Sequence, residues 1–254
     1  MTPAEMAAVF AAGTGAGAVN AVVGSGTLIT FPVLLATGLP PVTATVSNGL
    51  GLVPGSISAA IGYREELRGQ RRRVLLLGIG AVLGGLAGAV LLLTLPASAF
   101  ERIVPVLVSL ALVLVACQPL ISKWVRRRRP AGGPVRRDGG PLLFTGLTLA
   151  SVYGGYFSAA QGIIYVSLMG MLLDDTLQRL NAAKNVLAAV VNTVAAVLFV
   201  FFADFDWTAV LLIAVGSALG GLIGARTGRR FSPAVLRTLI VSVGTVALVH
   251  LVLH

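Results

Sequence analysis

The chain has 254 residues, of which 56% are hydrophobic and 11% are charged, and its mean hydropathy is +0.93. This composition excludes an ordinary soluble domain, because soluble domains carry about a quarter charged residues. The net charge of +10 comes mostly from arginines in short stretches between apolar segments, which is typical of membrane topology signals rather than of a nucleic-acid surface. With two histidines and one cysteine, the sequence has no cluster with metal-ligand spacing, so no metal, cofactor or nucleic-acid partner is expected.

Apolar segments follow one another along the whole chain, and several exceed the roughly 18 residues that mark a transmembrane helix. They cover residues 5–38, 42–63, 74–94, 102–122, 141–173, 178–203, 207–226 and 233–253. Their hydrophobicity does not alternate with the period of two that barrel strands require. The sequence therefore predicts an all-α polytopic membrane protein, with the lipid bilayer as its surroundings.

The first and fifth segments are too long for one straight crossing, because a helix of about 32 residues would measure about 48 Å. Each is interrupted by small or polar residues, GSG at 24–26 and AQG at 160–162. We predict that each segment enters the membrane, breaks and returns to the side it came from, and that the two breaks line the substrate path. The alternative is a strongly tilted or kinked helix.

The loops between segments predict the orientation of the chain. Arginines and one lysine gather in loops 64–73, 123–140 and 226–230, which the positive-inside rule places in the cytoplasm. Asp204 and Asp206 lie in a loop that should face outward. The expected location is the inner (plasma) membrane, with several crossings.

Residues 74–89 and 210–225 are nearly the same sequence, with ten of sixteen positions identical. The loops before them are predicted on opposite sides of the membrane, so the two copies would cross in opposite directions. We therefore predict two inverted structural repeats, 1–122 and 141–254, joined by a basic cytoplasmic linker at 123–140. Each repeat would hold a broken, re-entrant first segment followed by three transmembrane helices.

Both copies carry a ladder of glycines spaced by four, Gly80/Gly84/Gly88 and Gly216/Gly220/Gly224. Such ladders allow helix backbones to approach closely. We interpret them as packing within the chain, with homodimerisation as the alternative.

Polar residues inside apolar segments are the best candidates for a substrate site. Lys184 is the only lysine within a predicted span, and a buried lysine costs roughly 2.5–3.5 kcal/mol on insertion scales, so a compensating partner is expected. It either faces an anion or snorkels to the interface, about 9 Å away. Helices that restart after Gly26 and Gly162 would add free backbone N–H groups for an anion.

The candidate substrate-binding residues are Ser25, Gly26, Asn48, Tyr153, Tyr156, Gln161, Gly162, Asn181, Lys184 and Asn185. For the two tyrosines, a place in the interfacial aromatic belt is the alternative. No nucleophile–base pair or metal set can be assembled from the sequence, so we expect no enzymatic activity.

Several stretches resemble the TauE/SafE sulfite exporter family. They are GSGTLITFP and ATVSN in the first half, and YGGYFSAAQG, DDTLQRLNAAKNVLAAVVNT and GGLIGARTGRRF in the second. Ser25 and Thr27 interrupt the glycine run that is common in the family. The resemblance implies a transporter of small sulfur oxyanions or organosulfonates, often an exporter.

The predicted function is thus export of sulfite or an organosulfonate by alternating access between the two repeats. Expelling a dianion at about −150 mV is favoured by roughly 7 kcal/mol, so the potential alone could drive export. An ion-coupled importer or channel for a small anion is the alternative within transport. A non-transporting membrane scaffold is the alternative from another class.

Overall fold

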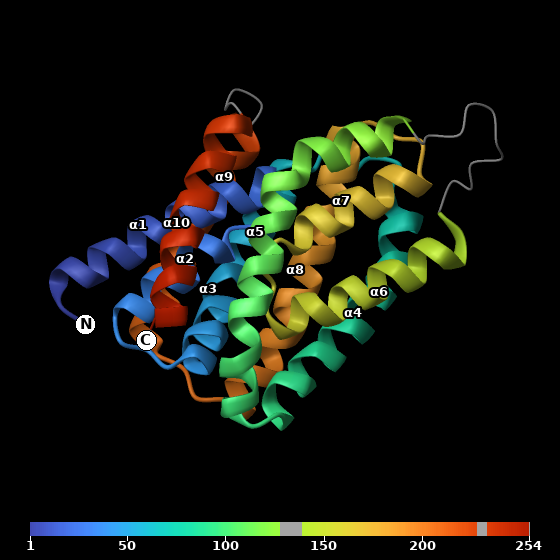
Figure 1. The fold of residues 1–254 in the computed structure, drawn as a ribbon. Helices are drawn as coiled ribbons and strands as arrows, with labels where there is room; N and C mark the ends of the chain where they lie inside the picture. Colours follow the sequence, from blue (N-terminus) through green and yellow to red (C-terminus); the bar gives the residue numbers. More distant parts are fainter. Residues whose placement is uncertain (128–138, 228–232, 254) are drawn as a thin grey trace.

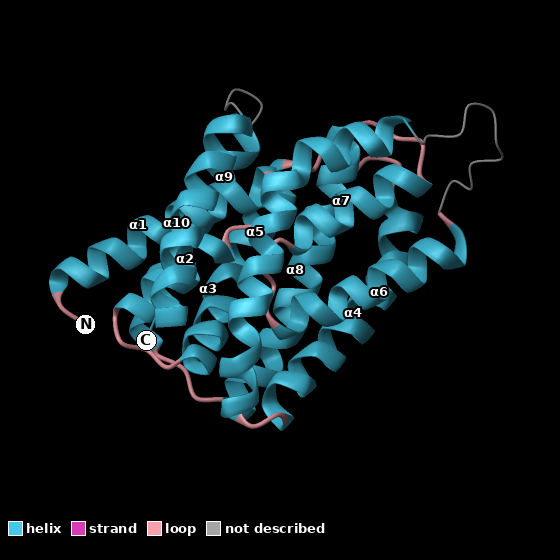
Figure 2. Ribbon diagram, viewed as in Figure 1, coloured by secondary structure: helices cyan, strands magenta, loops and turns pink. Residues whose placement is uncertain are grey.

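The computed structural model describes residues 1–127, 139–227 and 233–253, and in these residues every regular element is an α-helix (Figures 1 and 2). The described helices are α1 (Pro3–Val22), α2 (Thr27–Ala36), α3 (Pro41–Gly62), α4 (Arg71–Thr94), α5 (Ala97–Arg127), α6 (Gly140–Tyr156), α7 (Gln161–Leu172), α8 (Leu177–Phe202), α9 (Trp207–Thr227) and α10 (Pro233–Leu253). Among the described residues, α4, α5 over Ala97–Ile121, α8 and α9 are long and apolar enough to cross a membrane. The chain is therefore a multi-pass membrane protein.

The first and fifth predicted segments are each divided into two helices. The first break, residues 23–26, lies where the sequence predicts it, and Gly24 turns the chain there with a φ of +87°. The second break, residues 157–160, begins three residues before the predicted position, so that Gln161 and Gly162 belong to α7. Each long segment is thus a pair of separate helices rather than one kinked helix.

The second break is made without glycine. Ser158 and Ala160 have φ values of 60° and 58°, in the left-handed region that residues with a side chain rarely adopt. Non-glycine residues in this region persist only where the surrounding structure holds them, and they cluster at functional sites. Ala160 is fully buried, so packing from all sides holds this turn.

The glycine ladders lie against helices of the other half of the chain. Gly216 and Gly220 meet the backbone of α1, where a Cβ on Gly216 would lie 2.6 Å from Phe10 O. Gly84 in α4 meets α6 in the same way, and a Cβ there would lie 2.5 Å from Ser151 Cβ. The ladders are therefore packing surfaces within the chain, as predicted.

The helices of the two halves correspond in order and spacing. The starts of α8, α9 and α10 follow those of α3, α4 and α5 by 136 residues each. Helix packing follows the same correspondence: α1 lies along α9 while α6 lies along α4, and α3 and α8 pack on each other. Figure 1 shows the two halves interleaved around α3 and α8 rather than side by side as separate lobes.

Helix ends shift several predicted loop boundaries. Arg71, Arg72 and Arg73 already belong to α4, and α5 continues to Arg127, beyond the predicted end of the first repeat at 122. Most of the predicted linker 123–140 (residues 128–138) and most of the loop at 226–230 lie outside the described residues.

An ion-pair network, called the loop network below, joins the loop before α4 and the first turn of α4 to the loop before α8 and the first turn of α8. Asp175 accepts from Arg73 Nη1 and Arg179 Nε, both at 2.7 Å. Gln70 Nε2 donates to Arg179 O at 3.0 Å, which ties the two loops at a second point. Both loops lie at the upper right of Figure 1, so the network fastens the two halves together at one end of the bundle.

Candidate functional site

Inside the bundle, the first break meets the start of α7, directly after the second break. The N–H of Gly162 donates to Gly24 O at 3.1 Å. The approach is so close that a Cβ on Gly162 would lie 2.6 Å from Gly24 Cα and 2.9 Å from Lys184 Cδ. Glycine is required at both positions because any side chain would drive the breaks apart.

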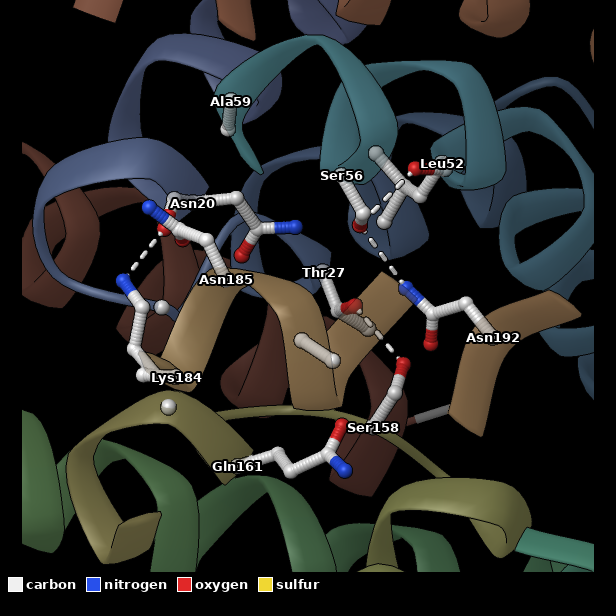
Figure 3. Close-up of a pocket in the computed structure, with 13 residues that line it drawn as sticks. Asn20, Thr27, Leu52, Ser56, Ala59, Ser158, Gln161, Lys184, Asn185 and Asn192 are labelled. Atoms are coloured by element: carbon white, nitrogen blue, oxygen red, sulfur yellow. Dashed lines mark hydrogen bonds between the residues drawn. The ribbon is translucent and has the colours of Figure 1, made fainter. Parts of the chain in front are cut away.

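A small cavity, called the central cavity below, lies at this meeting point (Figure 3). Its lining residues are Asn20, Gly24, Thr27, Leu52, Ser56, Ala59, Ser158, Gln161, Gly162, Lys184, Asn185, Ala188 and Asn192. They come from both halves of the chain, mainly from the breaks, α3 and α8. The cavity volume is about 20 Å³, only slightly more than the 10–15 Å³ that one water molecule needs.

Three side chains of α8 cap the broken end of α1. Lys184 Nζ donates to Asn20 O at 2.8 Å and to Ala21 O at 3.3 Å. The amides of Asn181 and Asn185 donate to Ala21 O at 3.0 and 3.2 Å. The last carbonyls of a helix lack intrahelical partners and carry its negative dipole end, so an ammonium and two amides stabilise the break.

Lys184 is only 1% exposed. Its ammonium therefore does not reach the membrane interface, and the snorkelling alternative is wrong. The two carbonyls use two of its three N–H groups. It is the only charged residue among those that line the central cavity, so the cavity has a positive wall with no carboxylate opposite.

Hydroxyls and an amide connect the first break to the second. Thr30 donates to Asn48 Oδ1, and Asn48 Nδ2 donates to Thr27 Oγ1 at 3.2 Å. Thr27 Oγ1 lies 3.0 Å from Ser158 Oγ, across the gap between the halves. Asn48 thus positions a cavity residue without lining the cavity itself.

Two further chains of hydrogen bonds end at the cavity wall. Ser151 Oγ lies 2.6 Å from Tyr165 OH, and Gln161 Nε2 donates to the same hydroxyl at 2.7 Å. On the other side, Asn192 Nδ2 donates to Ser56 Oγ at 3.1 Å. Both chains hold an amide side chain of the wall in a fixed orientation.

Of the predicted site residues, Gln161, Gly162, Lys184 and Asn185 line the central cavity. Ser25, Gly26, Asn48, Tyr153, Tyr156 and Asn181 do not. Two of the N–H groups at the restarting helices have acceptors within the protein: Gly26 N donates to Asn20 Oδ1 at 2.8 Å, and Gly162 N donates to Gly24 O.

The tyrosines lie elsewhere in the bundle. Tyr156 is buried and packs on Phe100 with ring centroids 5.5 Å apart, so it does not belong to an interfacial belt. Within the described residues the buried hydroxyls of Ser25, Tyr153 and Tyr156 have no hydrogen-bond partner.

Sequence reasoning missed Asn20, Thr27, Ser56, Ser158 and Asn192 as lining residues. One signal could have found a pair of them: Ser56 and Asn192 are separated by 136 residues, the spacing of the sequence repeat. Asn20 is an amide in an otherwise small and apolar stretch just before the first break, which also marks it as a candidate.

Among the described residues, no group of three His, Cys, Asp or Glu side chains could hold a metal ion. Asp175, in the loop before α8, pairs with Arg73 and Arg179 instead. Burial opposes ionisation of Asp175, but hydrogen bonds from Arg73 and the Thr176 amide and the charge of Arg179 hold its pKa below the ordinary value.

The family model described as sulfite exporter TauE/SafE matches residues 9–251. Among curated proteins, the chain is 26% identical over 250 residues to the probable membrane transporter protein YfcA of Escherichia coli K12, covering 97% of this chain and 89% of that protein. It is 25% identical over 239 residues to a probable membrane transporter protein of Haemophilus influenzae, covering 93% and 90%. The probable membrane transporter protein ORF9 of a Sinorhizobium species is 25% identical over 249 residues, covering 97% and 92%. No solved structure matches the chain.

Proposed function

The chain belongs to the sulfite exporter TauE/SafE family of membrane transporters, and we propose that it exports a small sulfur oxyanion or organosulfonate through the central cavity. The substrate, the direction of transport and the site go beyond the family assignment.

The observation that carries the proposal is the charge of the cavity wall. Lys184 is buried there without a carboxylate partner among the lining residues. A buried ammonium is costly unless something compensates it, and in a membrane such a residue marks a substrate or ion path. The α1 carbonyls stabilise it partly, and a bound anion would complete the compensation.

The arrangement of the helices supports two inverted repeats, 1–122 and 141–254. The matching helix starts and the exchanged packing partners are what a two-fold relation between the halves requires. Two residues that a two-fold axis relates to each other can be in contact only near that axis. Ser56 and Asn192 are 136 residues apart, which is the repeat spacing, and they are hydrogen-bonded to each other. The cavity would therefore lie on the axis, between the halves.

Alternating access follows from the small size of the cavity. A volume of about 20 Å³ leaves no room for an oxyanion with its contacts, so transport requires the halves to move apart. The loop network around Asp175 closes one end, which the basic residues of loop 64–73 assign to the cytoplasm. We infer that this network opens when substrate enters from inside.

The direction follows from the charge of the substrate. Moving one negative charge out of a cell is favoured by about 2.3 kcal/mol of free energy per 100 mV of inside-negative potential. Among the described residues, no acidic side chain lines the cavity to bind a coupling cation. Export driven by the potential alone is therefore the mechanism that this site supports best.

Sulfite efflux from reconstituted vesicles tests the proposal. We expect the rate of efflux to rise with an imposed inside-negative potential and to be independent of proton and sodium gradients. Lys184→Gln keeps an N–H donor for the α1 carbonyls but removes the charge, and it should lower the rate about tenfold or more. Asn181→Ala removes one cap hydrogen bond outside the cavity and serves as the control, with a rate within about threefold of wild type.

Efflux that depends on a cation gradient would favour the coupled importer. Wild-type vesicles that pass no anion would favour a non-transporting scaffold. Equal rates for wild type and Lys184→Gln would show that the charge of Lys184 has no part in transport.

A further inference from the structure

The hydrogen-bond donors and acceptors of the cavity wall are not those of a simple anion site. Negative ions accept hydrogen bonds, so a site for a fully deprotonated oxyanion should present donors alone. The central cavity has amide oxygens in its wall as well. Resting on the proposed function, we infer that the substrate is an anion that also carries its own O–H or N–H donor, such as hydrogensulfite or a hydroxyalkyl- or aminoalkylsulfonate.

The orientation of the Gln161 amide follows from counting protons along one chain. Ser151 Oγ donates its only proton to Leu147 O at 2.7 Å. Tyr165 OH, 2.6 Å away, must then donate to Ser151. Its oxygen is therefore an acceptor for Gln161 Nε2 at 2.7 Å, which leaves the carbonyl oxygen Oε1 as the free end of the Gln161 amide.

A second chain fixes Asn192 in the same sense. Ser56 Oγ donates to Leu52 O at 3.1 Å, so it can only accept from Asn192 Nδ2, also at 3.1 Å. The oxygen Oδ1 is again the free end of the amide. In Figure 3 it points away from Ser56, on the side of the cavity where Ser158 and Gln161 lie.

Gln161 Oε1 and Asn192 Oδ1 have no hydrogen-bond donor among the described residues. Neither is among the fully buried side-chain atoms that lack a partner. Both residues line the cavity, so the two oxygens can accept hydrogen bonds from a bound ligand. Donors are present as well: the third N–H of Lys184 is unused, and Asn20 accepts with Oδ1, which leaves its Nδ2 as a donor. The site thus suits a ligand with a charged acceptor end and a donor.

The two amide oxygens also disfavour anions that carry no hydrogen-bond donor. A sulfonate without a donor would either place its negative oxygens against the amide oxygens of Gln161 and Asn192 or leave those two amide oxygens without a hydrogen-bond donor. Sites built to bond a hydroxyl discriminate strongly against analogues that lack it, because the buried polar groups of the site are then left without a partner. Gln161 and Asn192 would therefore determine specificity, and Tyr165 would act as a positioning residue for Gln161.

A matched ligand pair tests the inference. 2-Hydroxyethanesulfonate and 1-propanesulfonate have the same charge and the same number of heavy atoms, and they differ by a hydroxyl in place of a methyl. We expect wild-type vesicles to export the hydroxyl compound at least about tenfold faster. Efflux of each compound would be measured from vesicles loaded with both, beside sulfite as a reference substrate.

Two variants identify the source of the preference. Tyr165→Phe frees the Gln161 amide to turn its NH₂ group into the cavity, and Gln161→Met removes the acceptor. Each should narrow the preference to within about threefold. Ser167→Ala is the control, because Ser167 lies on the same helix α7, donates to Ile163 O and does not line the central cavity, and it should keep the wild-type preference.

Equal export of the two sulfonates by wild type, or a preference unchanged in both Tyr165→Phe and Gln161→Met, would overturn the inference while sulfite transport stands. Wild-type vesicles that export neither sulfite nor a sulfonate would instead overturn the proposed function.

Discussion

At the scale of single residues, Lys184 combines two tasks. Its ammonium closes the end of α1 through two carbonyls, and it remains the one charge in the cavity wall. A lysine used only as a cap would tolerate replacement by an uncharged donor. A lysine used for substrate would not, which is why Lys184→Gln and Asn181→Ala separate the two tasks.

Asp175 is the residue on which the loop network depends, because both arginines converge on its carboxylate. We expect Asp175→Asn to lower stability at neutral pH by about 1–3 kcal/mol, since charge-assisted hydrogen bonds are lost. The folded protein holds the pKa of Asp175 below its ordinary value, so this contribution is present above the unfolded pKa of about 3.9 and is lost as pH falls through the folded value.

Thermal unfolding of both proteins across pH 7 to 3 measures this prediction. The gap between wild type and Asp175→Asn should be largest near neutral pH and should close in acid. Asp204→Asn is the control, since Asp204 makes no ion pair in the described part of the chain. A gap that stays constant down to pH 3 would contradict the assigned role of the charge.

At the scale of elements, the glycine ladders decide how closely the halves approach. A Cβ on Gly84 would lie 2.5 Å from Ser151 Cβ and 3.0 Å from Val152 N, whereas a Cβ on Gly78, in the same helix, meets nothing within 4 Å. We expect Gly84→Ala to destabilise the protein by about 1–3 kcal/mol through overpacking. Gly78→Ala should be neutral or slightly stabilising, because alanine is the better helix former.

Unfolding temperature in detergent compares the two variants directly. The same change in both variants would contradict close packing of α4 on α6 as the reason for the ladder.

The two breaks illustrate how far the sequence predicts the elements. The first break can be predicted from the sequence because glycine readily adopts the left-handed conformation that Gly24 has there. The second begins earlier than expected because Ser158 and Ala160 adopt that conformation without glycine, and nothing in their residue types predicts it. Only the packing of the break explains it, with Phe157 against Phe31 and Ser158 Oγ 3.0 Å from Thr27 Oγ1.

At the scale of the whole molecule, composition and the repeat were enough to predict a helical membrane transporter. The candidate site was predicted in part. Lys184 and Gln161 stand out as polar residues in apolar spans, but the sequence does not say which face of a helix looks inward. Asn48 and Asn181 therefore entered the list although they support the cavity from behind, and Asn20 was missed although its carbonyl holds Lys184.

The central claim is that the cavity around Lys184 binds a small sulfur anion. The most direct test is the unfolding temperature of the purified protein with sulfite, sulfate, thiosulfate, sulfoacetate, taurine and chloride in turn. We predict that at least one sulfur anion raises the temperature by about 5 °C at a hundredfold excess over its Kd, in wild type and Asn181→Ala but not in Lys184→Gln. A panel that stabilises none of the proteins, or stabilises Lys184→Gln as much as wild type, would contradict the claim.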